Sequence, residues 1–336
     1  MTIQSREVRL KAYPKGYPAE GDFELATVEL PEPNEGEFLV KNLFMSVDPY
    51  MRGRMTQRKS YIPPFEVDKV MEGAAVGVIE KSLNPRFQEG EHVVSMYGFR
   101  EYFLSDGSGM LMKVDPTLAP IEAYLGVLGM TGLTAYVGLK RVADLKENER
   151  VLVSAASGAV GSVACQIAKI MGCTVVGTAS SDEKCAWLLN DLKIDKAINY
   201  KKAQNLTHAF SEALPEGIDV YFENVGDVFL EAALENMRDF GRVVLCGMIS
   251  LYNLEEPKPG PSNLFLAIMK RLKLQGFIVS DCMDMHKDFL ADMTRWIQEG
   301  RIVWRETVYG GIENAIKAFL GLFDSENVGK MLVKLG

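Results

Sequence analysis

From Arg150 to Ser280 the chain alternates short runs of β-branched and aromatic residues with helical patterns. The successive runs are VLVSAA, GAVGSVACQIAKIMG, CTVVGTAS, DEKCAWLLNDL, KAINY, LTHAFSEAL, DVYFENV, VFLEAALENM, GRVVLCG, LFLAIMKRL and QGFIVS. Continuous apolar strands that are connected by helices form a parallel sheet covered on both faces. The sequence therefore predicts an α/β fold with a doubly wound parallel sheet of about six strands.

The two flanking segments show a different pattern. Up to about residue 125, short alternating apolar runs such as FELATVEL, FLVKNLFMSV and AAVGVIE are separated by Pro and Gly turn signals, as in a small β-barrel or sandwich. After one amphipathic helix, MHKDFLADMTRWIQEG, the runs VWRETVYG and KMLVKL have no helical partners of their own. We therefore expect residues 1–125 and 302–336 to form one domain and residues 126–301 the other.

Charge and cysteine content exclude several classes of protein. Thirty-seven basic against 45 acidic residues give a formal charge of -8, which opposes a nucleic-acid role. The amino terminus carries charges every few residues and no long apolar run, so we expect a cytoplasmic protein with no membrane partner. The five cysteines are odd in number and irregularly spaced, which favours reduced thiols over a disulfide framework.

The strand VLVSAA leads directly into a glycine-containing turn and a helix. The dinucleotide motif G-x-G-x-x-G appears here as Ala156-x-Gly158-x-x-Gly161, with alanine in the first position. Small residues at this point let backbone N–H groups and the positive helix end approach a pyrophosphate. A tight turn without a ligand is the alternative, and the surrounding βα units disfavour it.

The end of the next strand predicts which dinucleotide binds. NAD enzymes usually place Asp or Glu there, on the ribose hydroxyls, but this chain has Thr178, Ala179 and Ser180. Ser180 and Ser181 begin a capped helix that carries Lys184 near its start, a position suited to a 2′-phosphate. The sequence therefore predicts NADPH rather than NADH, although Lys184 could also be a solvated surface lysine.

The residue types of the first domain also argue against a metal. Catalytic zinc needs three side-chain ligands from Cys, His, Asp or Glu. The first domain has no cysteine and a single histidine, His92. We therefore expect no zinc, and a carbonyl oxygen polarised by hydrogen bonds instead.

Several motifs resemble one known family. They are SVDPYMRGRM, LGMTGLTAY, AASGAVGS, SDEK, NYK, ENVG, CGMISLYN, GFIV and ENVGKMLV. Together they resemble the zinc-independent medium-chain dehydrogenase/reductases, in the branch of the leukotriene B4 12-hydroxydehydrogenases, prostaglandin reductases and plant 2-alkenal (double-bond) reductases. In VMEGAAVGVIE, Met71 stands where zinc-dependent relatives carry a histidine ligand.

This resemblance implies a fold, an assembly and residue roles. It implies a Rossmann NADP-binding domain inserted into a GroES-like β-barrel catalytic domain, usually in a homodimer. The pyrophosphate would lie on Gly158, Ala159, Val160 and Gly161, and the 2′-phosphate end on Lys184 and Tyr200. The nicotinamide half would be held by Met130, Asn224, Cys246, Gly247, Met248, Ile249, Ser250, Tyr252, Phe277, Ile278, Val279 and Asn327.

Two tyrosines would act nearer the chemistry. Tyr252 matches the tyrosine that holds the nicotinamide ribose and helps to supply a proton, and Tyr50 falls where family members face substrate. From pattern alone, Tyr200 could be an ordinary half-buried tyrosine, Met130 and Phe277 could be core residues, and Asn224 could be a turn former.

The resemblance implies NADPH-dependent reduction of the carbon–carbon double bond of α,β-unsaturated aldehydes or ketones, an oxidoreductase acting on CH–CH groups. Hydride would add to the β-carbon, the ribose hydroxyl held by Tyr252 would meet the enolate oxygen, and Tyr252 or water would protonate the α-carbon. Three alternatives remain: an NADPH:quinone oxidoreductase, an enzyme that oxidises a secondary lipid alcohol, and a non-catalytic NADPH-binding sensor. The missing zinc disfavours alcohol oxidation.

Overall fold

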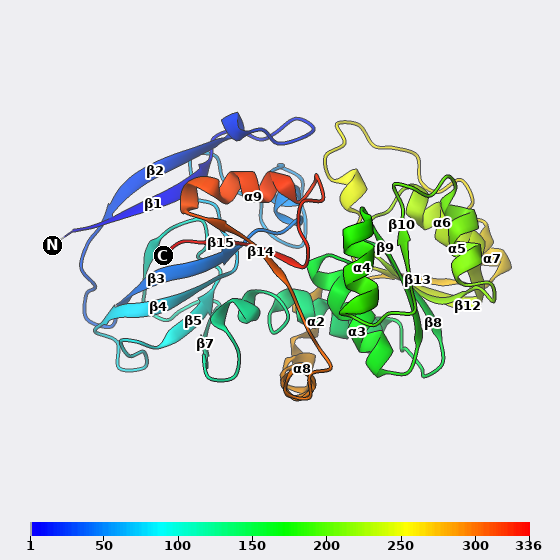
Figure 1. Cartoon of the computed structure of the whole chain (residues 1–336). Coiled ribbons are helices and arrows are strands. Elements are labelled where there is room, and N and C mark those ends of the chain that lie inside the picture. The colour runs from blue at the N-terminus through cyan, green and yellow to red at the C-terminus, as the bar shows by residue number, and fades with distance from the viewer. Residues whose placement is uncertain (1) are drawn as a thin grey trace. The chain divides into compact units, whose positions relative to one another are not determined.

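The computed structural model describes residues 2–336, which divide into two compact units (Figure 1). Unit 1 consists of the residues up to Gly126 together with Glu306–Gly336, and unit 2 is Val127–Arg305. A parallel sheet occupies unit 2, and a mainly antiparallel sheet occupies unit 1. The predicted α/β fold class is confirmed.

Unit 2 contains six parallel strands in the order β10-β9-β8-β11-β12-β13 (Figure 1). The strands are β8 (Arg150–Val153), β9 (Thr174–Ala179), β10 (Lys196–Asn199), β11 (Ile218–Glu223), β12 (Met237–Leu245) and β13 (Lys273–Gly276). The chain runs outward from β8 to β10 and then returns to place β11 against the other side of β8. This reversal creates a switch point between β8 and β11, where such sheets bind ligands at their carboxyl ends.

Helices connect these strands and cover the sheet. They are α2 (Met130–Val137), α3 (Ala159–Ile170), α4 (Asp182–Asn190), α5 (Leu206–Ala213), α6 (Val228–Asn236), α7 (Leu266–Met269) and α8 (His286–Gln298), with short helical turns η3 (Gly138–Val142), η4 (Ile249–Leu251) and η5 (Val279–Met285). Leu152, Tyr221 and Val243 of three neighbouring strands are buried together with Phe210 of α5 and Leu230 of α6. The apolar strand runs thus form a core that fixes where their carboxyl ends lie.

Unit 1 contains a seven-stranded sheet in the order β14-β15-β3-β4-β5-β7, with β6 also paired to β3. Its neighbours pair antiparallel except for β14 and β15, and β1 forms a separate antiparallel pair with β2. The strands are β1 (Ile3–Leu10), β2 (Phe23–Leu30), β3 (Phe38–Ser46), β4 (Ala75–Ser82), β5 (His92–Ser95), β6 (Tyr102–Ser105), β7 (Leu111–Val114), β14 (Glu306–Gly310) and β15 (Lys330–Lys334). The helical segments are α1 (Met51–Arg54), α9 (Ala315–Gly321), η1 (Glu20–Asp22), η2 (Ile121–Leu125) and η6 (Ile312–Asn314).

Three details of the sequence prediction are wrong. The last parallel strand is Lys273–Gly276 rather than QGFIVS, because β13 pairs only with β12 and an edge strand does not have to be apolar throughout. The helical run LFLAIMKRL shortens to α7, whose side chains Ile268 and Met269 stay exposed. The C-terminal strands do have a helix between them, because Ala315 and Phe319 of α9 are spaced to bury one face.

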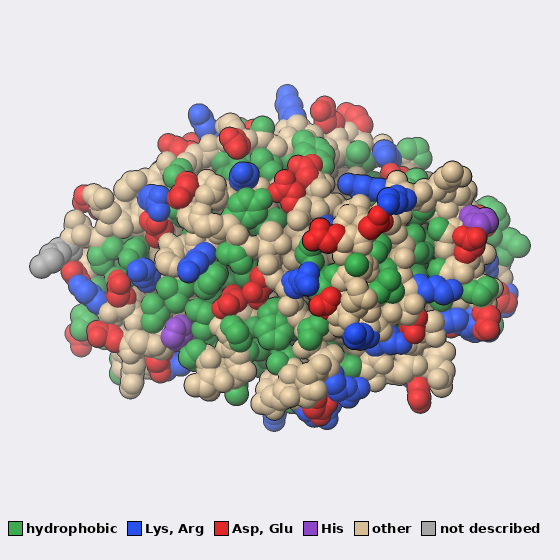
Figure 2. Space-filling model, in the orientation of Figure 1, with side chains coloured by type: hydrophobic (Ala, Val, Ile, Leu, Met, Phe, Trp, Pro, Cys, Tyr) green, Lys and Arg blue, Asp and Glu red, His purple; other side chains and the backbone are tan. Residues whose placement is uncertain are grey.

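The surface of the chain carries many charged side chains of both signs. On the face shown in Figure 2, Lys and Arg are interspersed with Asp and Glu. Exposed pairs include Lys81 with Glu32 at 2.8 Å and Arg141 with Asp284 at 2.5 Å.

Within residues 2–336, no helix has both the length and the hydrophobicity that a transmembrane segment requires.

Candidate coenzyme and active site

The turn between β8 and α3 is built around small residues. Ala155 has a φ of +47°, and the N–H of Ala156 donates to the carbonyl of Thr178 at 2.9 Å. Helix α3 begins at Ala159, and its N-cap residue Gly158 has no side chain to cap it. No acidic residue lies in the first turn of the helix. The first N–H groups of such a helix and its positive dipole end favour an anion.

Gly161 explains how closely this helix approaches the turn. A Cβ atom at Gly161 would lie 2.3 Å from the carbonyl oxygen of Ala155, whereas one at Gly158 would lie 3.2 Å from the same oxygen. The backbone leaves no room for a side chain at Gly161. The predicted loop from Gly158 through Ala159 and Val160 to Gly161 thus forms a tight cradle, which is what a pyrophosphate group needs for close backbone approach.

The two strands at the switch point are joined directly by their next residues. The backbone N–H of Asn224, after β11, donates to Oγ of Ser154, after β8, at 2.8 Å. The Asn224 side chain donates from Nδ2 to the carbonyl oxygen of Ser154 at 2.7 Å. Asn224 therefore does more than form a turn, because its side chain sets the distance between the two strand ends.

Glu223 lies beneath this junction, although the sequence analysis gave it no role. Its side chain is fully buried, and Oε1 accepts hydrogen bonds from Oγ of Ser154 at 2.8 Å and from N–H of Val225 at 2.6 Å. Its carbonyl oxygen accepts the N–H groups of Cys246 and Gly247, both at 3.0 Å. Burial raises the pKa of Glu223. Glu223 is an acidic residue at the end of an apolar strand, and this pattern in the sequence could have indicated its role.

Lys184 lies in the first turn of α4 and is mostly buried, with 7% of its surface exposed. Its backbone N–H donates to Oγ of the capping Ser181 at 3.2 Å. Burial, and then the nearby charge of Lys201, lower the pKa of Lys184. The side chains of Lys184, in α4, and Lys201, after β10, are neighbouring cations, and a bound anion would stabilise them.

Tyr200 follows β10 on the same side of the sheet. Its N–H donates to the carbonyl of Ala179 at 3.1 Å, which ties it to the end of β9. Its ring meets the ring of Phe229 edge-on, with centroids 5.1 Å apart. Tyr200 is thus half-buried and held beside the strand end that precedes Lys184.

The loop after β12 contains six predicted residues, which are Cys246, Gly247, Met248, Ile249, Ser250 and Tyr252. The N–H of Ile249 donates to the carbonyl of Asn224, and the N–H of Ser250 to that of Val225, both at 3.1 Å. The N–H of Met248 donates to the hydroxyl oxygen of Tyr252 at 3.2 Å. The loop is therefore tied to the β11 loop, and the phenol of Tyr252 folds back over it.

Gly247 and Cys246 show how compact this loop is. A Cβ atom at Gly247 would lie 3.2 Å from the hydroxyl oxygen of Tyr252, so the absence of a side chain at this position leaves room for the phenol. Burial raises the pKa of the Cys246 thiol to about 12. Cys246 is therefore an inert thiol at neutral pH, because the thiolate is the reactive form.

The other predicted residues of unit 2 also follow strand ends or start helices. Phe277 and Ile278 come directly after β13, and Val279 begins η5. They lie beyond the strand and not within it, on the side where the other loops emerge. Met130 is the first residue of α2 and is 37% exposed, so it is not a core residue.

Tyr50 and Asn327 belong to unit 1. Tyr50 precedes α1 and packs against the core of that unit, and burial raises its pKa. The side chain of Asn327 donates to the carbonyl oxygen of Gly329 at 2.8 Å, which shapes the start of β15. Met71 is fully buried in the same core.

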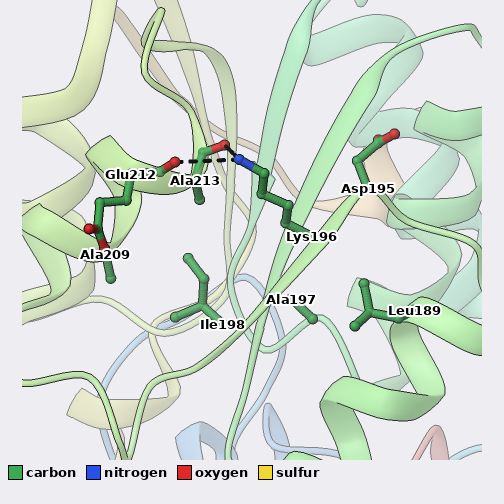
Figure 3. Close-up of a pocket in the computed structure, with 8 residues that line it drawn as sticks. All are labelled: Leu189, Asp195, Lys196, Ala197, Ile198, Ala209, Glu212 and Ala213. Carbon is green, nitrogen blue, oxygen red and sulfur yellow. Dashed lines mark hydrogen bonds between the residues drawn. The ribbon is translucent and has the colours of Figure 1, made fainter.

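Figure 3 shows a cavity of about 480 Å³ along the edge strand β10. It is lined by Leu189, Asp195, Lys196, Ala197, Ile198, Ala209, Glu212 and Ala213. Nζ of Lys196 donates to the carbonyl oxygens of Glu212 and Ala213, at 3.4 and 2.9 Å, and so caps the end of α5 (Figure 3). None of the predicted site residues lines this cavity.

No group of three or more His, Cys, Asp or Glu that could hold a metal ion occurs among residues 2–336.

Two family models match the chain. The model described as the N-terminal domain of oxidoreductase matches residues 6–114, and the one described as zinc-binding dehydrogenase matches residues 159–299. The second match includes Lys184, Tyr200 and the loops after β11, β12 and β13, whereas β8, Met130 and Asn327 lie outside both matches.

Relatives of known name match over the full length. The chain is 42% identical to the NADP⁺-dependent 2-alkenal reductase of Nicotiana tabacum, covering 98% of this chain and 97% of that protein. It is 44% identical to prostaglandin reductase 1 of Bos taurus, covering 99% of each chain. The crystal structure of CurA from Vibrio vulnificus in complex with NADPH superimposes with a TM-score of 0.93 at 39% identity, covering 98% of this chain and 99% of that one.

Proposed function

The chain belongs to the zinc-independent medium-chain dehydrogenase/reductases, and we propose that it reduces the carbon–carbon double bond of α,β-unsaturated aldehydes and ketones. It is an NADP-dependent oxidoreductase of the alkenal, prostaglandin and curcumin reductase type. The observation that carries the finer proposal is full-length identity of 42% and 44% to two reductases whose names specify an alkenal and a prostaglandin.

The residues of unit 2 fit the NADPH coenzyme. The cradle from Gly158 to Gly161 has glycine at both ends and an uncapped helix start, which suits the pyrophosphate. Lys184, with Lys201 beside it and no carboxylate at the end of β9, suits the 2′-phosphate. We assign Tyr200 to the same end of the coenzyme.

The nicotinamide half is assigned to the remaining strand ends. Asn224, the loop from Cys246 to Tyr252, and Phe277 to Val279 follow β11, β12 and β13, which are neighbours in the sheet. Met130 starts α2. The roles of Tyr50 toward substrate and of Asn327 toward the coenzyme stay predictions.

Bound NADPH supplies the hydride that adds to the β-carbon of the substrate. The substrate then carries negative charge on its carbonyl oxygen and needs a proton at the α-carbon. We assign the proton donor to Tyr252, because a tyrosine hydroxyl donates hydrogen bonds at neutral pH. The N–H of Met248 that donates to the same oxygen strengthens that donor and orients it.

Turnover of matched substrates tests this proposal. NADPH consumption is measured with a 2-alkenal, the corresponding saturated aldehyde and a simple quinone, and NADPH formation from NADP⁺ is measured with a secondary alcohol. The proposal predicts rapid consumption with the alkenal and none with the saturated aldehyde. Preferred turnover of the quinone would identify a quinone oxidoreductase, and NADPH binding without any consumption would identify a sensor.

We also propose that the chain forms a homodimer through unit 2. Strand β13 is the last strand of its sheet, and Leu264, Phe265, Ile268 and Met269 beside it expose 49%, 57%, 81% and 62% of their surface. An unpaired strand edge next to an apolar patch favours association with a second copy. Light scattering coupled to gel filtration tests this, and Ile268→Asp should shift the mass toward the monomer.

The cytoplasmic location expected from the sequence likewise stays a prediction.

A further inference from the structure

Glu223 contacts all three loops that emerge around the switch point of unit 2. Its Oε1 atom accepts from Ser154, which follows β8, and from Val225, which follows β11. Its carbonyl oxygen accepts from Cys246 and Gly247, which follow β12. One residue thus joins the phosphate turn to the two loops assigned to the nicotinamide half.

The surroundings of this carboxyl group contain no cation. Glu223 is fully buried and forms no ion pair within residues 2–336. Its Oε2 atom is buried without a hydrogen-bond partner in the described part of the chain. The polar groups that adjoin the carboxyl are the N–H groups of Val225 and Gly226, the hydroxyls of Ser154 and Tyr221 and the thiol of Cys246, and none of them is charged at neutral pH.

A negative charge at this place would be unfavourable for two reasons. A buried carboxylate without a cation has lost its hydration and gained no compensating partner. It would also lie one residue from the loops assigned to an anionic coenzyme and would repel the phosphates. A proton on Oε2 removes both costs, while Oε1 keeps its two donors.

We propose that Glu223 is a protonated positioning residue, which holds Ser154, Asn224 and the Cys246–Gly247 turn in the arrangement that binds NADPH. This inference rests on the coenzyme assignment made under the proposed function. Two hydrogen bonds connect these residues: the N–H of Asn224 donates to Oγ of Ser154, and the hydroxyl of Ser154 donates to Oε1 of Glu223. Removal of Oε1 leaves the Ser154 hydroxyl with only the more distant carbonyl oxygen of Phe222, at 3.4 Å, and loosens the contact between β8 and β11.

Three variants test the proposal: Glu223→Gln, Glu223→Leu and Ser154→Ala. Glutamine keeps Oε1 and is neutral, so E223Q should bind NADPH within about twofold of the wild type, as a neutral isostere does. Leucine removes Oε1, so E223L should weaken NADPH about tenfold or more, with the KM for the alkenal unchanged. Because Ser154 and Glu223 act in one path, the double variant of S154A and E223L should bind NADPH no more weakly than the worse single variant.

A spectroscopic readout on the coenzyme-free protein reports the proton itself. Infrared spectra of the wild type at neutral pH should contain a carbonyl stretch of a protonated carboxyl group that is missing from E223Q. Glu149→Gln is the matched control, because Glu149 is paired with Arg242 at 2.6 Å and should contribute no such band. E149Q should also lower the free energy of unfolding, whereas E223Q should not.

Two results would overturn the proposal. A wild-type spectrum without a band that E223Q removes would show that the carboxyl is ionised. Wild-type NADPH affinity in E223L, measured by NADPH fluorescence, would show that Glu223 positions nothing. A wild-type protein that fails to bind NADPH would instead contradict the coenzyme assignment, and an inactive protein that still binds NADPH would contradict only the alkenal reaction.

Discussion

Nζ of Lys330 lies 2.9 Å from Oδ1 of Asp48 inside unit 1, and both side chains are buried, with 5% and 15% of their surface exposed. The same ammonium group also donates to the carbonyl oxygens of Val47 and Met331, at 3.0 and 3.2 Å. Asp48 further accepts from the hydroxyl of Ser46. The pair therefore fixes strand β15 to the segment that leaves β3 and leads to Tyr50.

Replacing Lys330 by methionine should destabilise unit 1 strongly. The change removes the ammonium group from the mostly buried carboxylate of Asp48, and breaking such a pair costs about 3–5 kcal/mol. Lys81→Met is the control, because its partner Glu32 is solvent-exposed and such a pair contributes about 1 kcal/mol or less. Urea denaturation measures both free energies of unfolding, and equal losses in the two variants would contradict a structural role for the buried pair.

The parallel sheet could be predicted from the sequence because most of its strands are continuous apolar runs followed by a small or polar residue. The glycines at 158 and 161 and Lys184 were recognised in the same way, from residue type and position.

Other features could not be predicted from local pattern. The Lys330–Asp48 pair joins residues separated by 282 positions, and only the pairing of β15 with β3 brings them together. The hydrogen-bond partner of the Glu223 carboxyl could not be predicted either, since Ser154 lies 69 positions away in the sequence. Helix α9 was missed because it is seven residues long and lies between two strands.

Tyr252→Phe should lower turnover about ten- to a thousandfold, which is the effect of removing one donor to a developing negative charge. Affinity for NADPH should change little, because the aromatic ring of Tyr252 stays in place and the contact of its hydroxyl with the N–H of Met248, at 3.2 Å, is weak. Steady-state rates with an alkenal and NADPH fluorescence measure the two effects separately. Tyr102→Phe, on β6, is the matched control and should keep full turnover. Normal turnover in Y252F would remove Tyr252 from the mechanism.

Lys184→Ala should weaken NADPH about 10- to 100-fold and leave NADH nearly unchanged, because a charge-assisted hydrogen bond to phosphate is lost only with NADPH. Dissociation constants for both coenzymes, from fluorescence titration, give the ratio. The exposed Lys287→Ala on α8 controls for a general change of net charge. An equal loss for the two coenzymes in K184A would show that Lys184 does not contact the 2′-phosphate.

The lowered pKa of Lys184 also predicts how NADPH affinity changes with pH. Burial and Lys201 make the free protein release this proton at a lower pH than an ordinary lysine, whereas a bound phosphate dianion favours the protonated form. NADPH affinity should therefore fall as the pH rises through that lowered pKa, and NADH affinity should not. Titrations between about pH 7, where the phosphate is already a dianion, and pH 10 measure this. A fall of the same size in K184A would contradict the assignment.

The most direct test of the proposed reaction follows a label from coenzyme to product. NADPH carrying deuterium at C4 of the nicotinamide is oxidised with a 2-alkenal, and the product is examined by NMR. The account predicts a saturated aldehyde with deuterium on the β-carbon and a solvent proton on the α-carbon. Deuterium on the carbonyl carbon of an unsaturated alcohol would contradict it, because the hydride would then have reduced the carbonyl group and not the double bond.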